Sequence, residues 1–269
     1  MTLPSAQTIW QDIEQIRAQS PLIQNITNFV VMNTTANALL ALGASPAMVH
    51  ASDDAADFAA IASALVVNIG TLDTTFVAGM RAAMGRASAL GKPIVFDPVG
   101  VGATPYRNRI SQELLALAVP TIIRGNASEI MALAGLQIQT KGVDSTASSS
   151  AAVESARQLS RQLGCVVVVS GADDYVVQGD RMARLSNGHP MMSLVTGMGC
   201  TATALTGAFA AINPDPFAAA VGSMAVMGVV GQLAAQAAPG PGTLQVDFLD
   251  RLYRLTSQQL TDTLTLSLS

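Results

Sequence analysis

The alternation of short β-branched runs with alanine-rich segments constrains the fold most strongly. The runs LVVNI at residues 65–69 and CVVVV at residues 165–169 are almost entirely apolar, which is typical of strands buried on both faces. The segments between such runs have the length and composition of helices. This alternation predicts an α/β fold with a mostly parallel central sheet, helices on both faces and right-handed crossovers.

The same alternation places each expected element along the chain. The expected parallel strands are Ala44–Val49, Leu65–Ile69, Pro93–Asp97, Thr121–Arg124 and Cys165–Ser170. The expected helices are Thr34–Leu42, Asp53–Ala62, Asp73–Leu90, Asn108–Leu117, Ala127–Ala134 and Ala151–Leu163. The polar stretch Lys141–Ser150 is expected to be a surface loop, and no internal repeat is found. We therefore expect residues 1–269 to form one domain.

The pattern changes after Ser170, where short runs follow one another closely. Gly-Asp and Asn-Gly pairs, which are strong hairpin signals, separate these runs. We expect an antiparallel edge on the sheet, built from Tyr175–Gln178, Met182–Leu185 and Met191–Val195. From Cys200 onward the chain is expected to be helical, with a break at Asn213.

Composition narrows the classes of partner. Only 12% of the residues are charged and 50% are hydrophobic, against a usual charged share of about a quarter. Other subunits are therefore expected to cover part of the surface. The net charge of -4 and the lack of a basic run argue against nucleic acid as a partner.

Membrane insertion and export are not expected either. The most apolar stretch, residues 217–231, is shorter than the roughly 20 residues that span a bilayer. Residues 1–19 contain acidic side chains and no long apolar core, unlike a signal peptide. The two cysteines, Cys165 and Cys200, show no metal-binding spacing. A reduced, cytoplasmic setting is the simplest expectation.

The segment Thr196-Gly197-Met198-Gly199-Cys200 is the strongest candidate for a functional site. It is expected to lead from a strand through two glycines into a helix. Glycines allow backbone amides to approach an anion closely, and the first amides of a helix have no internal partners. The helix dipole adds partial positive charge there, so the segment is suited to bind phosphate. It is neither a Walker loop nor a complete dinucleotide fingerprint.

Cys200 falls in the first turn of that expected helix. A helix N-terminus lowers the pKa of a thiol, and such a thiol could accept a proton from an attacking hydroxyl. The structural alternative is a small buried residue, which is the commoner role of cysteine. Cys165, at the start of an apolar strand, fits that alternative better.

Polar residues at other strand ends are the next candidates, because ligands of open parallel sheets bind beyond the carboxyl ends of the strands. Asp97 and Glu129 are candidates for a Mg²⁺ site that acts through water, and Arg124 is a candidate phosphate ligand. The structural alternatives are a turn for Asp97 and, for Glu129, a capping box with Asn126. The isolated His50 and His189 are interpreted as structural or solvent-facing.

Eight segments together resemble the hydroxyethylthiazole kinases and keep that family's order. They are Pro21–Asn28, Asn33–Asn37, Ala41–Met48, Asn68–Thr71, Asp97–Thr104, Arg124–Glu129, Lys141–Ser145 and Thr196–Cys200. The resemblance implies a three-layer ribokinase-like fold and the ATP- and Mg²⁺-dependent phosphorylation of the hydroxyl of 4-methyl-5-(2-hydroxyethyl)thiazole in thiamin salvage. It also implies homotrimers with active sites at subunit interfaces.

The resemblance also assigns roles to single positions. It implies that the thiazole contacts Asn28, Met48 and Gly197 and that ATP contacts Arg124 and Ser170. It implies that Asp97 and Glu129 organise Mg²⁺. It also implies that Cys200 stands where most of the wider superfamily has an aspartate base. We group Gly199 with the ATP residues because its amide belongs to the expected phosphate-binding helix start.

Three other functions remain open at this stage. A kinase of the same fold could act on a hydroxymethylpyrimidine or a sugar, although the region between Asn28 and Met48 has few polar side chains to hold sugar hydroxyls. The presence of Asp97, Arg124, Glu129 and Cys200 together argues against a nucleotide-binding regulator that has lost catalysis. A cysteine hydrolase would need a base, and no histidine lies near Cys200 in the sequence.

Overall fold

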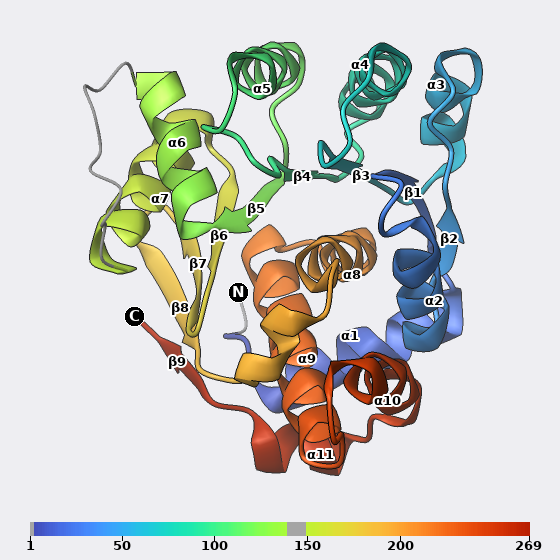
Figure 1. The fold of residues 1–269 in the computed structure, drawn as a ribbon, viewed down its shortest axis with the longest axis vertical. Helices are drawn as coiled ribbons and strands as arrows, with labels where there is room; N and C mark the ends of the chain where they lie inside the picture. The colour runs from blue at the N-terminus through green and yellow to red at the C-terminus, as the bar shows by residue number, and fades with distance from the viewer. Residues whose placement is uncertain (1–2, 139–148) are drawn as a thin grey trace.

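A computed structural model describes residues 3–138 and 149–269 (Figure 1). Most of the stretch expected as a loop, Lys141–Ser150, lies outside the described residues, and its last two residues begin a helix. Within the described residues, the chain forms a mixed sheet between two layers of helices, as the alternating pattern predicts.

The sheet has nine strands in the order β2-β1-β3-β4-β5-β6-β7-β8-β9 over the described residues. Strands β1 to β6 pair in parallel, and β7, β8 and β9 extend the sheet antiparallel. The strands are β1 Leu22–Ile26, β2 Ser45–Ala47, β3 Ala64–Asn68, β4 Ile94–Asp97, β5 Ile122–Asn126, β6 Val166–Ser170, β7 Asp174–Gln178, β8 Arg181–Leu185 and β9 Leu266–Leu268. The expected parallel sheet with an antiparallel edge is therefore confirmed.

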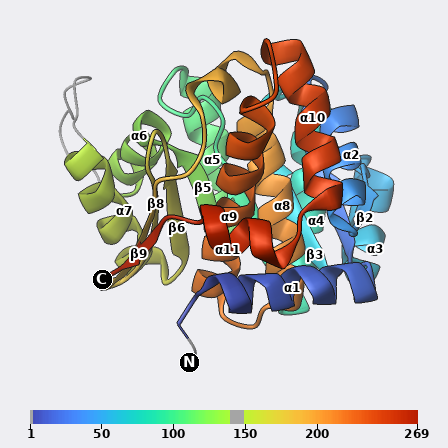
Figure 2. The ribbon, with the colours of Figure 1, turned by 90° about the horizontal axis from the view of Figure 1, so that it is seen from below.

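The helices form one layer on each face of the sheet (Figure 1). One layer contains α3 Ser52–Ile61, α4 Thr74–Ala89, α5 Pro105–Leu117, α6 Ala127–Ile138 and α7 Ser149–Leu163. The other contains α1 Ala6–Gln19, α2 Met32–Leu42, α8 Met198–Ile212, α9 Pro216–Ala235, α10 Pro241–Arg254 and α11 Ser257–Thr263. Figure 2 shows α1 running beside α11 across the underside of this second layer.

Successive strand residues enter two separate cores, because side chains alternate between the faces of a strand. Val166 and Val168 pack in the core beneath α8 and α9, whereas Val167 and Val169 pack in the core beneath α6 and α7. Both faces of β6 are thus buried, which explains its continuous apolar run. Because helices cover both faces of β6, only its carboxyl end can contact a ligand.

Four described elements differ from the sequence-based expectation, and one of them is α1, which was not among the expected helices. β1 was not expected as a strand because Gln24 and Asn25 interrupt its apolar pattern, yet both side chains are buried between the helix layers. β9 was not expected within the helical C-terminal third, but it pairs with β8.

The prediction of a strand at Met191–Val195 is wrong. The structure has a 3₁₀-helix there, η1, at Pro190–Leu194. Pro190 has no N–H for a sheet ladder. The His189 ring nitrogen Nδ1 accepts a hydrogen bond from the Met191 N–H at 3.2 Å and caps the turn.

The most apolar helix, α9, lies inside the protein. Its 20 residues are long and apolar enough to cross a membrane by length and composition, but 89% of the apolar window is buried. Glycines allow close packing along it; a Cβ at Gly222 would lie 2.9 Å from the Phe209 ring. α9 is therefore the closely packed core helix that its alanine-rich sequence predicts.

Candidate active site

The carboxyl ends of the parallel strands gather the candidate residues at one edge of the sheet. Asn68 and Asp97 are the last residues of β3 and β4 and are register partners in the sheet. Ser170 ends β6, and Arg124 lies inside β5. Parallel pairing therefore brings together residues that lie far apart in the chain.

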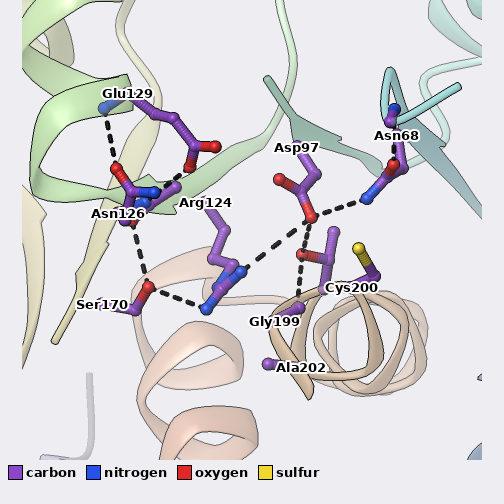
Figure 3. A network of polar contacts seen from close by, with 12 residues as sticks. Asn68, Asp97, Arg124, Asn126, Glu129, Ser170, Gly199, Cys200 and Ala202 are labelled. Carbon is purple, nitrogen blue, oxygen red and sulfur yellow. Dashed lines mark hydrogen bonds and ion pairs between the residues drawn. The ribbon is translucent and has the colours of Figure 1, made fainter. Parts of the chain in front are cut away.

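A chain of hydrogen bonds links these strand ends to α8 (Figure 3). Asp97 Oδ2 accepts from Asn68 Nδ2 at 2.8 Å and from the Thr203 hydroxyl at 2.7 Å. Asn28 Nδ2 donates to Asn68 Oδ1 at 2.9 Å and lies 3.5 Å from Cys200 Sγ. The structure thus joins Asn28, Asp97 and Cys200 in one polar network.

Asp97 is the most deeply buried carboxylate of this network, with 1% of its surface exposed. Burial raises its pKa to about 6, although Arg124, Thr203 and Asn68 act in the opposite direction. Arg124 Nη1 lies 4.0 Å from Asp97 Oδ2, so this ion pair is loose and compensates only part of the desolvation. A buried carboxylate with incompletely compensated charge is typical of a cation-binding or catalytic site.

Cys200 lies in the first turn of α8, as expected, but its electrostatic setting differs from the expectation. Burial raises the pKa of the thiol, and the nearby Asp97 carboxylate raises it further. The sequence analysis predicted a lowered pKa because of the helix N-terminus; desolvation and Asp97 outweigh that effect here. Cys200 is therefore a neutral thiol at neutral pH, suited to orient a hydroxyl rather than to act as a strong base.

The start of α8 exposes backbone amides to the site. Gly197 is the N-cap with φ of 81°, and no side chain caps the helix. A Cβ at Gly197 would collide with the Val31 side chain, and one at Gly199 would lie 2.8 Å from Arg124 Nη1. Glycine at both positions therefore keeps the first amides accessible to an anion.

A cavity of about 640 Å³ opens beside this helix start. Arg124, Ser170 and Gly199, the three residues assigned to ATP, all line it. Its apolar wall is formed by the methionines Met192, Met198, Met224 and Met227. None of Asn28, Met48, Gly197 and Cys200 lines this cavity, so within the described residues the two groups of candidate residues occupy separate places.

Arg124 connects the cavity to the network. Its Nη2 donates to the Ser170 hydroxyl at 2.7 Å, and that hydroxyl donates to the Gly125 carbonyl. Arg124 Nε is buried and has no hydrogen-bond partner in the described structure. A buried guanidinium with unused donors at the wall of a cavity is suited to bind phosphate oxygens.

Glu129 forms the capping box that was its structural alternative. Asn126 Oδ1 accepts from the Glu129 N–H at 2.9 Å, and Glu129 Oε2 accepts from the Asn126 N–H at 2.8 Å. Its other oxygen, Oε1, accepts from the Gly100 N–H at 2.8 Å. Glu129 therefore ties the start of α6 to the loop that follows Asp97.

The donor set fits a magnesium ion bound through few protein ligands. The described residues contain no group of three or more histidine, cysteine, aspartate or glutamate side chains. At Asp97, the hydrogen bonds of the described residues all reach Oδ2, which leaves Oδ1 for a cation or its water shell. Mg²⁺ keeps several waters and shares phosphate oxygens with one or two carboxylates, which this arrangement allows.

The other sequence candidates lie apart from the network. Met48 directly follows β2 at the same sheet edge and is half-buried. Gln24 Nε2 donates to the Val49 carbonyl at 3.1 Å and anchors the segment next to it. His50 stacks on Phe76, with ring centroids 4.3 Å apart, while His189 lines the cavity wall.

Sequence reasoning missed three polar residues of the site. Asn68 and Thr203 bind Asp97 directly, and Arg107 donates to the carbonyls of Ile69, Gly70 and Val99 at 2.6–2.7 Å. The position of Asn68 at the end of an apolar strand was a usable signal. The sequence contains no such signal for Arg107, because its contacts form only where α5 meets the loops that follow β3 and β4.

A model of the hydroxyethylthiazole kinase family matches residues 13–258. The hydroxyethylthiazole kinase of Leptothrix cholodnii is 56% identical over 256 residues, covering 93% of this chain and 92% of that protein. The one from Granulibacter bethesdensis is also 56% identical, over 247 residues, with 92% and 90% covered. In both matches the identity extends over nearly the full length of the two proteins.

Solved structures agree with these matches. The structure of the hydroxyethylthiazole kinase protein from Pyrococcus horikoshii OT3 superposes with a TM-score of 0.91 at 40% identity, covering 98% of this chain and 99% of that one. The pyridoxal kinase from Staphylococcus aureus in complex with AMP-PCP matches at a TM-score of 0.61 and 17% identity, with 79% and 88% covered. A ribokinase-like superfamily protein from Enterococcus faecalis also matches at 0.61, with 15% identity and 88% and 87% covered. These last two similarities concern the fold, which is the ribokinase-like fold.

Proposed function

This chain belongs to the hydroxyethylthiazole kinase family, and on that premise we propose that it transfers the γ-phosphate of ATP to the hydroxyl of 4-methyl-5-(2-hydroxyethyl)thiazole, as a step of thiamin salvage. The observation that carries this proposal is the position of the α8 start between the Arg124 cavity and the Asn28–Cys200 pair. A phosphoryl donor on one side and an alcohol on the other would meet there.

The proposed ATP site is the cavity that contains Arg124, Ser170 and Gly199. Its volume of about 640 Å³ is in the range of sites that hold small ligands. The Arg124 guanidinium has an unused Nε donor and the α8 amides lie beside it, which supports binding of the phosphates. The methionine wall supports binding of the apolar faces of the base.

The proposed acceptor site comprises Asn28, Met48 and Gly197, next to Cys200. Asn28 is 4% exposed and contacts Cys200 Sγ, which supports a position near the reacting hydroxyl. Met48 would provide an apolar wall for the thiazole ring, and Gly197 a surface without a side chain. Cys200 is the proposed catalytic residue, whose neutral thiol orients the hydroxyl for attack on the phosphate.

Phosphoryl transfer of this kind depends mainly on positioning and electrostatics. Arg124 and the first α8 amides would hold the transferring phosphate, and Asn28 and Cys200 would aim the hydroxyl at it in line. Asp97 and Glu129 would hold Mg²⁺, directly or through water. The bound ion would supply charge neutralisation on the phosphate oxygens.

The magnesium role of Glu129 can be tested with the isosteric Glu129→Gln variant. Because both Glu129 oxygens accept backbone N–H groups, the amide can replace only one of these bonds and removes a negative charge. We expect the half-maximal Mg²⁺ concentration for activity to rise. Glu113→Gln, at an exposed ion pair with Arg81, is the matched control. An unchanged Mg²⁺ dependence in Glu129→Gln would remove Glu129 from the metal site.

We further propose that the 269 residues act as one kinase domain, in a homotrimer, in the cytoplasm. The continuous sheet from β2 to β9 supports the single domain. Exposed apolar side chains support self-association; Phe29 and Val30 next to Asn28 are 64% and 59% exposed, and Leu194 and Val246 are 69% and 61% exposed. A family in which subunits complete one another's sites would need such a surface near Asn28.

The experiment for this function is an acceptor panel. The protein is incubated with ATP, Mg²⁺ and hydroxyethylthiazole, a hydroxymethylpyrimidine or a sugar, and ADP release is followed. We expect the highest kcat/KM with hydroxyethylthiazole. A higher value for another alcohol would assign the same fold a different acceptor, and acceptor-independent ADP release would favour a hydrolase.

A further inference from the structure

We propose that Asn68 is a positioning residue that fixes the amide of Asn28 against the acceptor alcohol and joins it to Asp97. This inference rests on the proposed function, because it assumes that Asn28 contacts the alcohol. Asn68 is 1% exposed and ends β3, and Figure 3 shows its side chain hydrogen-bonded to Asp97. It would not touch the substrate itself; it would act through Asn28.

The hydrogen bonds of Asn68 determine which way its amide faces. The Gly70 backbone N–H, which can only donate, lies 2.9 Å from Asn68 Oδ1. Oδ1 is therefore the acceptor end, and Nδ2 faces Asp97 Oδ2 at 2.8 Å, where a carboxylate requires a donor. One backbone donor and one carboxylate thus assign both ends of the Asn68 side chain.

This orientation propagates to Asn28. Asn68 Oδ1 also accepts from Asn28 at 2.9 Å, so the Asn28 atom that faces it is Nδ2. The same Nδ2 lies 3.5 Å from Cys200 Sγ, so the two hydrogens of the amide have two acceptors. Asn28 Oδ1 remains as the atom that can accept a hydrogen bond from an alcohol hydroxyl.

Close packing limits the space in which Asn28 can move. A Cβ at Gly70 would lie 2.5 Å from Asn28 Nδ2 and 2.7 Å from its Cγ. The Asn28 side chain therefore packs closely against Gly70, but packing alone does not distinguish its oxygen from its nitrogen. The hydrogen bond to Asn68 supplies that distinction, so Asn68 presents the Asn28 oxygen to the acceptor alcohol before it binds.

A double-mutant cycle tests this coupling through acceptor binding. The dissociation constant of hydroxyethylthiazole is measured by calorimetry without ATP, for the parent, Asn28→Ala, Asn68→Ala and the double variant. We expect each single variant to bind about 3- to 10-fold more weakly, the range of one hydrogen bond. We expect the double variant to bind no more weakly than Asn28→Ala, because Asn68 acts through Asn28.

Two outcomes would contradict different claims. If Asn28→Ala leaves acceptor affinity unchanged, the proposed role of Asn28 in the acceptor site is wrong. If Asn28→Ala weakens binding and Asn68→Ala then weakens it further by its full single-variant factor, Asn28 keeps its role and the inference about Asn68 is wrong. A purely structural role of Asn68 would give this second, additive result.

The isosteric Asn68→Asp variant separates the two ends of the side chain and guards against a folding defect in Asn68→Ala. Aspartate retains an acceptor oxygen for Gly70 and Asn28, but it replaces the neutral donor to Asp97 by a second carboxyl group that must share a proton with Asp97. We expect acceptor affinity within about twofold of the parent, together with a lower kcat. Thr203→Val removes the other neutral donor to Asp97 and should lower kcat in the same way without changing acceptor affinity. Loss of acceptor affinity in Asn68→Asp equal to that in Asn68→Ala would overturn the proposal.

Discussion

At the scale of single residues, the site consists of groups held in unfavourable states by burial. Asp97 and Cys200 both have raised pKa values, mainly because they are desolvated. The sequence indicated which residues to consider, since they follow strand ends or begin a helix. It did not indicate the sign of the Cys200 pKa shift, because that sign is set by burial and by Asp97, which is 103 positions away in the chain and adjacent only in the fold.

Replacing Cys200 tests its part in catalysis. We expect Cys200→Ala to lower kcat by about 100-fold, since misplacing a reacting group by about 1 Å can cost about 10²-fold. KM should change little, because the thiol acts on the reacting hydroxyl. Cys165→Ala is the control; Cys165 is buried just before β6, at the strand end opposite Ser170. Steady-state kinetics that show equal kcat for Cys200→Ala and the parent would exclude Cys200 from the chemistry.

Asp97 is expected to lower stability in return for its function. A carboxyl whose pKa is raised on folding from 3.8 to about 6 favours the folded state only while protonated. The free energy of unfolding therefore falls as the pH rises through about 6. Above that pH it is about 3 kcal/mol lower than at acidic pH, where the carboxyl is protonated in both states.

The sign of this effect predicts the behaviour of Asp97→Asn. Without Mg²⁺, the variant should melt at a higher temperature than the parent at pH 8, and the difference should shrink toward zero by pH 4. Its kinase activity should be lost. Thermal denaturation across this pH range measures the difference, and a parent protein that is the more stable of the two at pH 8 would contradict the account.

At the scale of elements, parallel strand order does most of the positioning. The sequence predicted the strands β3 to β6 and the start of α8, because apolar runs and glycines mark them. It did not predict β1, where buried Gln24 and Asn25 break the pattern, nor η1, which forms because Pro190 cannot join a ladder. Both misses concern residues whose structure depends on distant partners or on a local cap.

The start of α8 gives a prediction for Gly199→Ala. The added Cβ would lie 2.8 Å from Arg124 Nη1, the end of a flexible side chain that can move aside. The fold should therefore remain stable while Arg124 leaves its position in the cavity. Loss of one charge-assisted contact would raise KM for ATP by about tenfold or more.

Gly242→Ala, in α10 with no heavy atom within 4 Å of the added Cβ, is the matched control. It should leave KM for ATP unchanged. Equal ATP kinetics in Gly199→Ala and Gly242→Ala would contradict the assignment of the cavity to ATP.

At the scale of the whole molecule, some of the exposed apolar side chains lie close to the site. Leu194 and Val246 flank Val195 and Gln245, which together line a small cavity, while Phe29 and Val30 follow Asn28 in the chain. A low charged fraction of 12% had already indicated partly covered surface. The sequence could not locate that surface, because it combines side chains from η1, α10 and the segment after β1.

Introducing charge at this surface tests the proposed trimer. We expect Val246→Asp to dissociate the assembly, since a carboxylate buried in an apolar interface is costly to desolvate. Light scattering coupled to size-exclusion chromatography would show the mass falling toward that of one chain. Leu117→Asp, at an exposed leucine that ends α5, should leave the mass unchanged. A monomeric parent protein would contradict the trimer outright.

The most direct measurement of the central claim is the identity of the product. The protein is incubated with ATP, Mg²⁺ and hydroxyethylthiazole, and the products are resolved by ³¹P NMR and mass spectrometry. The account predicts one phosphate monoester on the thiazole side-chain hydroxyl for each ADP formed, and no ester with Arg124→Ala, whose guanidinium lines the cavity. ADP and free phosphate without the ester, from the parent protein, would contradict it.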